Sequence, residues 1–142
     1  VFDGAALGKA LCEACAGWEK ILIPRAKIGN HEILEELQKK PGLSICDIAT
    51  YDTVYKASEV IDQKAEFEAG SIDCAVFTSA STVRGFAEAT PGLDYTKVRA
   101  ACIGKQTKAA ADALGMETCM AKKASIDSVL ELVIELKNKV KE

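Results

Sequence analysis

Residues 73–107 read DCAVFTSASTVRGFAEATPGLDYTKVRAACIGKQT, and this stretch decides the fold class. An apolar run over residues 73–77 predicts a buried strand, and the hydroxyl-rich turn after it leads into a helix. A proline and a glycine then break the chain before a second apolar run over residues 98–103, which turns at Gly104 into another helix. Strands that alternate with helices across short turns predict an α/β fold, made of βαβ units around a parallel sheet.

The same alternation extends to both sides of this stretch. We expect strands at residues 20–24, 44–50 and 117–120, and helices at 3–15, 30–40 and from Ser125 onward. In the last helix five apolar residues share one face, which we expect to be buried: Ile126, Val129, Leu130, Val133 and Ile134. Residues 52–72 have a weaker pattern, which predicts a connector and a short helix that ends at Gly70. Within it, the stretch from about Tyr55 to Gly70 is the best candidate for a passage between two lobes.

The composition limits the classes of protein that fit. Among 142 residues, 18 are Lys or Arg, 21 are Asp or Glu and 49% are hydrophobic, which leaves a net charge of −3. This balance excludes a disordered chain and disfavours a nucleic-acid binder that depends on bulk positive charge. No apolar run reaches the roughly 18 to 20 residues of a membrane span, so we expect no membrane partner. The chain begins at Val1 without a methionine, as a trimmed piece of a longer protein would.

Six cysteines are spread along the chain without the spacing of a metal site. Cys46, Cys74 and Cys102 lie in apolar, strand-like runs, which are typical of reduced, buried thiols and indicate a cytoplasmic protein. The CxxC pair at residues 12–15 falls late in a predicted helix, and the sole histidine, His31, cannot complete a ligand set. We therefore predict no metal.

Two turns at the ends of strands carry groups that suit an anion. Residues 78–82 hold four hydroxyls, and Ser79 and Ser81 could bind a carboxylate or only cap the following helix. The turn at Gly104 lacks the earlier glycine and the Ser or Thr after the lysine that a nucleotide-binding phosphate loop requires. Its N–H groups at a helix start still suit an anion; alternatively, Gly104 only permits the turn and Thr107 only caps the helix.

Three other polar residues lie at or near the ends of strands. Arg25 follows an apolar strand and Arg84 lies one turn into the helix after the serine-rich turn, so each could bind a carboxylate or remain solvated. Tyr51 ends a strand, where a tyrosine can act on a ligand or simply pack with its hydroxyl in solvent. A hydrolase triad is improbable, because the single histidine lies in a different βαβ unit from the serines.

Six short motifs follow one another along the chain: FDGAAL (2–7), ILIPRA (21–26), TYDTV (50–54), FTSASTVR (77–84), ACIGKQT (101–107) and SID (125–127). In this order and spacing they resemble the uroporphyrinogen-III synthase family, over nearly the whole chain. One departure occurs at Lys105, where proline is common in the family, and it bears on the local turn.

The resemblance implies parts of two Rossmann- or flavodoxin-like lobes, with the active site in the cleft between lobes. It assigns residues 1–55 to the end of an inserted lobe, 56–72 to a crossing connector and 73–142 to the C-terminal lobe. The family closes the linear tetrapyrrole hydroxymethylbilane into uroporphyrinogen III, with inversion of ring D and loss of water, and needs no metal or organic cofactor. In some bacteria the synthase is fused behind a uroporphyrinogen-III C-methyltransferase. Because half of the cleft is missing, we expect this piece to be nearly inactive alone, and a homodimer is one expected form of it.

The resemblance also suggests roles for individual side chains. Tyr51 is the candidate general acid, and Ser79 and Thr107 are candidate binding hydroxyls. The substrate carries eight carboxylates, so the expected binding set also includes cations and helix starts: Arg25, Ser81, Arg84 and Gly104.

Two alternatives from other functional classes stay open. The first is a non-catalytic module that binds a small anion, of response-regulator type. It would need acidic residues clustered at strand ends to hold Mg²⁺, whereas Asp47 lies within a strand and Asp52 lacks acidic partners. The second is a domain of sugar-phosphate-binding type, which only the serine-rich turn suggests.

Overall fold

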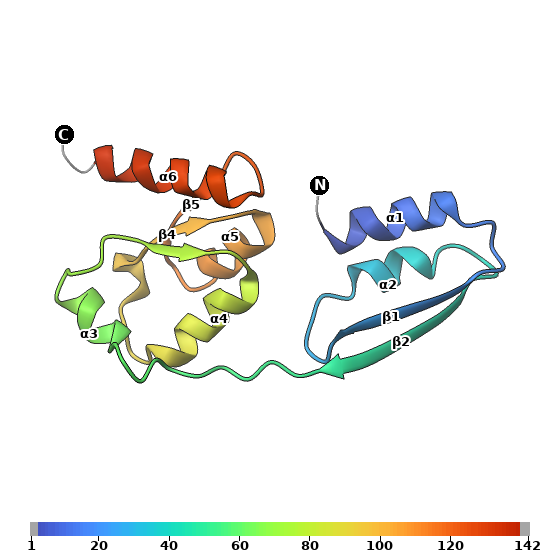
Figure 1. The fold of residues 1–142 in the computed structure, drawn as a ribbon, viewed down its shortest axis with the longest axis horizontal. Helices are drawn as coiled ribbons and strands as arrows, with labels where there is room; N and C mark the ends of the chain where they lie inside the picture. The colour runs from blue at the N-terminus through green and yellow to red at the C-terminus, as the bar shows by residue number, and fades with distance from the viewer. Residues whose placement is uncertain (1–2, 140–142) are drawn as a thin grey trace. The chain divides into compact units, whose positions relative to one another are not determined.

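The computed structural model describes residues 3–139, in which helices and strands alternate (Figure 1). The strands are β1 (Lys20–Ala26), β2 (Ser44–Tyr51), β3 (Ala75–Phe77), β4 (Arg99–Cys102) and β5 (Glu117–Met120). The helices are α1 (Gly4–Ala14), α2 (Glu32–Leu37), α3 (Gln63–Glu68), α4 (Ala80–Ala89), α5 (Lys105–Asp112) and α6 (Ile126–Lys139), with a 3₁₀ turn at Tyr95–Lys97. Phe2, the first residue of the FDGAAL motif, lies outside the described residues.

The five strands form two separate parallel sheets. β1 pairs with β2 in one sheet, and the other sheet has the order β3-β4-β5. The chain divides between Val54 and Tyr55 into two compact units, here called unit 1 and unit 2. The expected α/β class, with parallel βαβ units in parts of two lobes, is confirmed.

In unit 1, helices α1 and α2 pack closely and lie on one side of the two-stranded sheet (Figure 1). Asp3 caps α1 by accepting a hydrogen bond of 2.7 Å from a backbone N–H of the first turn. Gly8 of α1 is buried, and a Cβ there would lie 2.6 Å from the Cβ of Glu36 on α2, so only glycine fits this crossing. Ile23 of β1 is buried, whereas its neighbour Leu22, on the opposite face of the sheet, is 59% exposed.

Unit 2 has a continuous hydrophobic core. Its helices α4 and α5 lie on one side of the sheet and α6 on the other (Figure 1), so residues 100–102 of the central strand β4 are fully buried. The core joins β3, α4, β4 and α5 through Phe77, Val83, Leu93, Val98, Ala100, Cys102, Ala111 and Met116. The Phe86 ring of α4 makes edge-on contacts within this core, with its centroid 5.5 Å from those of Phe67 and Phe77.

A pair of hydroxyls closes the C-terminal end of α4. Thr90 is fully buried, and its Oγ1 donates to the Phe86 carbonyl oxygen at 2.8 Å. The Tyr95 hydroxyl lies 3.2 Å from that Oγ1, 3.1 Å from the Ala87 carbonyl oxygen and 3.0 Å from the Thr90 carbonyl oxygen. These contacts satisfy carbonyl groups that a helix end leaves without an intrahelical partner.

The burial of the cysteines differs from the expectation at one position. Cys102 is buried as expected, and burial raises the pKa of its thiol to about 11. Cys74 is half-buried. Cys46 is exposed, and the expectation for it is wrong, because the strand register places it beside Leu22 on the open face of the sheet.

Two helices also differ from the expectation. α6 buries Val129 and Leu136, but Ile126, Leu130 and Ile134 are each more than half exposed, because α6 contacts β4 and β5 with one side only. The helix expected over residues 30–40 is shorter, because the chain after Leu37 tightens into turns with i→i−3 hydrogen bonds. Within the described residues, no helix has the length and apolar character to cross a membrane.

Candidate functional site

The carboxyl edge of the unit 2 sheet brings two of the predicted turns together. β3 and β4 are parallel neighbours in which Phe77 pairs with Cys102, and the Ile103 N–H donates to the Phe77 carbonyl at 3.0 Å. The chain therefore leaves both strands at the same edge and enters α4 and α5 side by side. Ligands of open parallel sheets bind at this edge.

Ser79 is the N-cap of α4 and takes part in a capping box. Its Oγ accepts the Thr82 N–H at 3.2 Å, and the Thr82 Oγ1 accepts the Ser79 N–H at 3.3 Å. The Oγ of exposed Ser81 lies 2.8 Å from the Oγ of Ser79. The capping role considered for Ser79 is thus present, and it leaves a cluster of hydroxyls at the helix start.

The start of α5 differs from that of α4 because its cap, Gly104, has no side chain. Its backbone is extended, with φ −166° and ψ 179°, and a Cβ there would meet nothing within 4 Å. The turn therefore does not require glycine, which disagrees with the interpretation that Gly104 is there only to permit the turn. Thr107, in the first turn of α5, is only 3% exposed, so its side chain lies in the interior.

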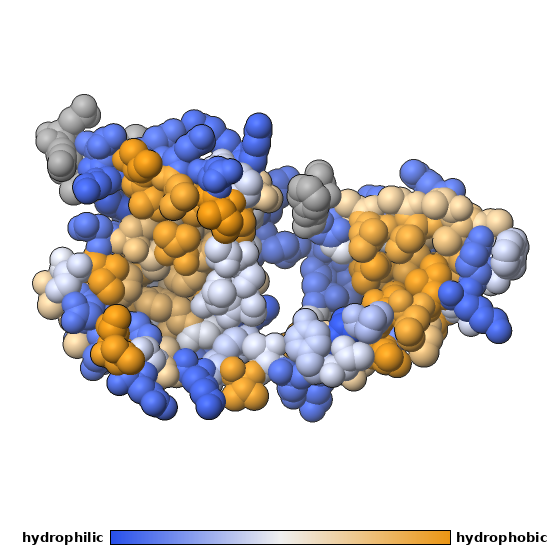
Figure 2. All heavy atoms as spheres, in the orientation of Figure 1, coloured by the Kyte–Doolittle hydropathy of each residue, from blue (hydrophilic) through white to orange (hydrophobic). Residues whose placement is uncertain are grey.

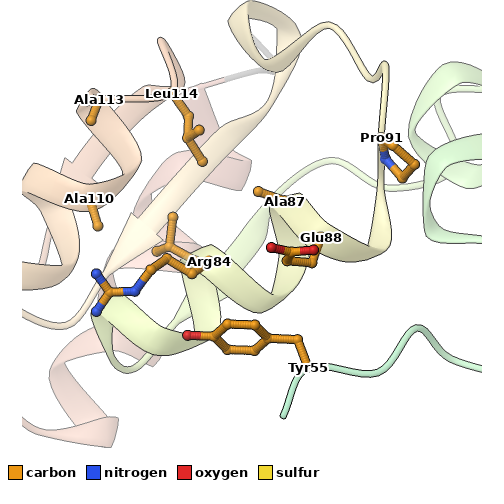
Figure 3. A pocket seen from close by; sticks show the side chains of 9 residues that line it. Tyr55, Arg84, Ala87, Glu88, Pro91, Ala110, Ala113 and Leu114 are labelled. Carbon is orange, nitrogen blue, oxygen red and sulfur yellow. The ribbon is translucent and has the colours of Figure 1, made fainter. Parts of the chain in front are cut away.

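A groove of about 580 Å³ lies on unit 2 between α4 and α5 (Figure 3). Its lining is mostly apolar and consists of Tyr55, Val83, Arg84, Ala87, Glu88, Pro91, Ala110, Ala113 and Leu114. Figure 3 shows the Arg84 guanidinium and the Tyr55 hydroxyl at the same end of this groove. Arg84 itself is exposed, one turn beyond the hydroxyl cluster.

The carboxyl edge of the unit 1 sheet holds Tyr51. A register shift after Arg25 pairs Ala26 with Tyr51, and the Lys27 N–H donates to the Tyr51 carbonyl at 2.8 Å. The Tyr51 side chain is 62% exposed, so a ligand can reach its hydroxyl. The Lys27 ammonium lies 3.7 Å from the Asp52 carboxylate beside it.

Arg25 is engaged by groups of unit 1 itself. Its guanidinium donates to both oxygens of the Asp47 carboxylate, at 2.7 and 2.8 Å, and lies 3.2 Å from His31 Nδ1. These hydrogen bonds lower the pKa of the Asp47 carboxyl and raise the pKa of the Arg25 guanidinium. A substrate carboxylate would compete with Asp47 for the same N–H groups.

The structure therefore sorts the predicted residues into two groups. Unit 2 brings together Ser79, Ser81, Gly104 and the first turn of α5, with Arg84 one turn along α4. Unit 1 holds Tyr51 and Arg25 on its own carboxyl edge. No group of three or more His, Cys, Asp or Glu side chains is arranged for a metal ion within the part of the chain that is described.

Arg84 was a site candidate in the sequence, whereas the other residues that line the groove, Tyr55 among them, were not. Tyr55 lies within the weakly patterned segment of residues 52–72 and belongs to no motif of its own. The signal that could have found it is Gly85, a glycine inside a strongly patterned helix, which often marks a close approach of another group.

Two parallel sheets, each with helices packed beside it, define an α/β protein, and in unit 2 two helix starts lie at the carboxyl edge of the sheet. The family model described as "Uroporphyrinogen-III synthase HemD" matches residues 1–131. The chain belongs to the uroporphyrinogen-III synthase family.

Individual relatives agree with this assignment. "Porphyrin biosynthesis protein HemD" of Ruminiclostridium josui is 29% identical over 136 residues, which are 96% of this chain and 27% of that protein. The crystal structure of uroporphyrinogen-III synthetase from Helicobacter pylori has a TM-score of 0.63 at 22% identity, over 92% of this chain and 59% of that one. A mutant uroporphyrinogen III synthase from the extremely thermophilic bacterium Thermus thermophilus has a TM-score of 0.57 at 15% identity, over 93% of this chain and 55% of that one.

These values define what is shared. The two structural likenesses, at 22% and 15% identity, show a common fold. The chain spans 27% of the curated relative and 59% and 55% of the two solved chains.

Proposed function

We propose that this chain is part of a uroporphyrinogen-III synthase, which closes hydroxymethylbilane into uroporphyrinogen III with inversion of ring D and loss of water. The observation that carries the proposal is the pair of adjacent helix starts at the carboxyl edge of unit 2, in a chain that belongs to this family. A substrate with eight carboxylates suits such a surface, because helix N-termini offer N–H groups and the positive end of a dipole.

Binding of the substrate is assigned mainly to unit 2. The hydroxyls of Ser79 and Ser81, the guanidinium of Arg84 and backbone N–H groups near Gly104 hold carboxylates. Since Thr107 is buried, its part in the proposal is to supply a backbone N–H rather than its hydroxyl. Arg25 in unit 1 belongs to the same set and would exchange Asp47 for a substrate carboxylate.

Tyr51 is proposed as the general acid. Its phenol donates a proton to the terminal hydroxyl of hydroxymethylbilane as the C–O bond breaks, so that water leaves and a positively charged azafulvene remains. The exposure of the side chain at the end of β2 supports this role. The reaction as proposed uses no metal or organic cofactor.

A binding experiment tests the proposal on the chain as it stands. Uroporphyrinogen III should raise the melting temperature, and the rise should shrink in Ser79→Ala and Ser81→Ala. Ser71→Ala is the matched control, because Ser71 is an exposed serine away from the helix starts and should leave the rise unchanged. No rise with the tetrapyrrole, together with a rise in Mg²⁺ and acyl phosphate or in hexose phosphates, would instead support an anion-binding module.

A turnover experiment tests the catalytic part. We expect this chain alone to give little uroporphyrinogen III above the spontaneous I isomer, because positioning a flexible substrate requires both walls of a site. In support, 41% of the solved H. pylori chain has no counterpart here, since the chain covers 59% of it. Efficient formation of the III isomer by the chain alone would contradict this expectation.

Four further assignments belong to the same proposal. Residues 1–55 are the end of an inserted lobe, 56–72 a crossing connector and 73–142 the C-terminal lobe; the boundary at Val54 and Tyr55 supports the first division. The free state of all six thiols supports a cytoplasmic, reducing location. We also propose that a homodimer forms through the exposed apolar side chains of α6, which are Ile126, Leu130 and Ile134. Sedimentation of the Leu130→Glu variant tests this dimer.

The last assignment is a methyltransferase fused to this chain in the parent protein. Sequencing the parent reading frame tests it.

A further inference from the structure

Gly85 lies inside α4, where glycine is less favourable than every residue except proline. Its backbone does not require glycine, because Gly85 is helical and is not among the glycines with positive φ. The Tyr55 ring instead occupies the space beside it. A Cβ at Gly85 would lie 3.0 Å from Cδ1, 3.6 Å from Cε1 and 3.8 Å from Cγ of Tyr55.

The Tyr55 ring therefore lies against the backbone of α4. Figure 3 shows the ring beside this helix, reaching from the connector toward Arg84. A methyl group at position 85 would stand closer to the ring than side-chain atoms normally approach, so the ring would have to move. The missing Cβ makes room for the ring.

The residues around Tyr55 are more exposed than Tyr55 itself, and Asp52 among them forms an ion pair with Lys27 of unit 1. Tyr55 is half-buried, whereas residues 52–54 and 56–61 are exposed, with Val54 at 78% and Val60 at 90%. Residues 52–58 have no regular secondary structure. The division into compact units also falls directly before Tyr55.

We propose that Tyr55 anchors the connector to α4 at the space left by Gly85, so that the chain bends freely only over residues 52–54. The anchor turns residues 56–62 into a loop fixed at both ends within unit 2, at Tyr55 and at the cap of α3. This role is independent of the reaction proposed above.

Trypsin tests the anchor directly, because Lys56 follows Tyr55 in the chain. Under native conditions, cleavage after Lys56 reports the fraction of molecules in which this part of the connector is released. Tyr55→Ala should raise that rate about tenfold, the size expected when a half-buried aromatic contact is lost. Tyr55→Phe keeps the ring and should retain the slow rate. Val54→Ala is the matched control, since Val54 is an exposed neighbour, and cleavage after Lys27 in unit 1 is the internal reference.

Gly85→Ala separates the anchor from a general effect on stability. Alanine favours the helix, so the melting temperature of unit 2 should rise, while cleavage after Lys56 should become faster because the ring is displaced. The double variant Tyr55→Ala/Gly85→Ala should be cleaved no faster than Tyr55→Ala alone, as expected for two residues that share one contact. An unchanged rate in Tyr55→Ala, or slower cleavage in Gly85→Ala, would overturn the proposal.

Discussion

The two units are built from the same βαβ pattern but bury very different amounts of apolar surface. Among the described residues, unit 1 buries two apolar side chains, Ile23 and Leu37, while Leu22 and Ile48 remain exposed on its sheet. In unit 2, residues 100–102 of the central strand are fully buried. A third strand and helices on both faces make the difference, since a two-stranded sheet with one helical layer leaves a face without cover. Figure 2 shows a broad hydrophobic surface on the side of unit 1 that is in view.

The largest expected effect is on the rate of ring closure, and it compares Tyr51 at the carboxyl edge of unit 1 with Ser79 at that of unit 2. In a protein that carries the complete synthase fold, Tyr51→Phe should slow ring closure by about 10²- to 10⁴-fold, the usual range for a general acid. Ser79→Ala should cost only about 1 to 2 kcal/mol, because neighbouring N–H groups still hold the carboxylate. The measurement is the rate of uroporphyrinogen III formation, with folding checked by melting temperature. If Tyr51→Phe keeps the wild-type rate while Ser79→Ala is inactive, Tyr51 is not the general acid and the site serves only to bind anions.

The second prediction compares the two hydrophobic surfaces. Phe77→Ala in the core of unit 2 should lower the free energy of unfolding by about 3 to 5 kcal/mol, because it leaves a cavity beside the Phe86 ring. Leu22→Ala in unit 1 should change it by less than about 0.5 kcal/mol, since Leu22 is already 59% exposed. Urea denaturation of both variants gives these values. Equal losses would mean that the open face of unit 1 is covered in solution.

The third prediction concerns the polar contacts of unit 2. Tyr95→Phe removes the hydroxyl that lies 3.0 Å from the Thr90 carbonyl oxygen and 3.2 Å from the Thr90 Oγ1. We expect a loss of about 1 to 2 kcal/mol in the free energy of unfolding, because a buried partner loses its hydrogen bond. Thr96→Ala, in the same 3₁₀ turn but exposed, is the control and should cost less. If Tyr95→Phe leaves the free energy of unfolding unchanged, the Thr90 hydroxyl alone is enough to satisfy the carbonyl groups at this helix end.

The last prediction concerns the contribution of Glu19, in unit 1, to the free energy of unfolding and its dependence on pH. The Glu19 carboxylate accepts the N–H groups of Ala16, Gly17 and Trp18, and these hydrogen bonds lower its pKa from 4.5 to about 2. Because the folded pKa is the lower one, the stabilisation is present above pH 4.5 and is lost as the pH falls toward 2. An NMR titration of the carboxyl carbon measures the pKa. Glu19→Gln should lose stability at pH 7 but little of it near pH 2, and an ordinary titration midpoint near 4.5 would refute the contact.

The order of elements was predictable from the sequence, because strand and helix periods and their glycine and proline breaks are local signals. The strand at Glu117–Met120 and the short helix before Gly70 are confirmed for this reason. Burial was less predictable. Cys46 and Leu130 have apolar neighbours in the sequence, but whether another layer covers them is decided by the whole fold.

The candidate site shows the same limit. Ser79 and Gly104 were recognisable as helix starts after strands, and the structure places those starts side by side. The ion pair between Arg25 and Asp47 was not recognisable in the sequence, because it depends on the parallel register of β1 and β2. The packing of Tyr55 on Gly85 joins residues far apart in the chain. In the sequence it is visible only as a glycine within a predicted helix.

The strand register described above also has a consequence for the speed of folding. Ala75 pairs with Ala100 and Arg99 with Glu117, so the two pairings in unit 2 join residues that are only 25 and 18 positions apart in the chain. The entropy of closing such a segment rises slowly with its length, by about 0.6 kcal/mol per doubling, so these pairings are inexpensive for parallel strands. Because the strand order β3-β4-β5 follows the chain, each strand of this sheet pairs with the next one in the sequence, and such local pairing favours rapid folding of unit 2.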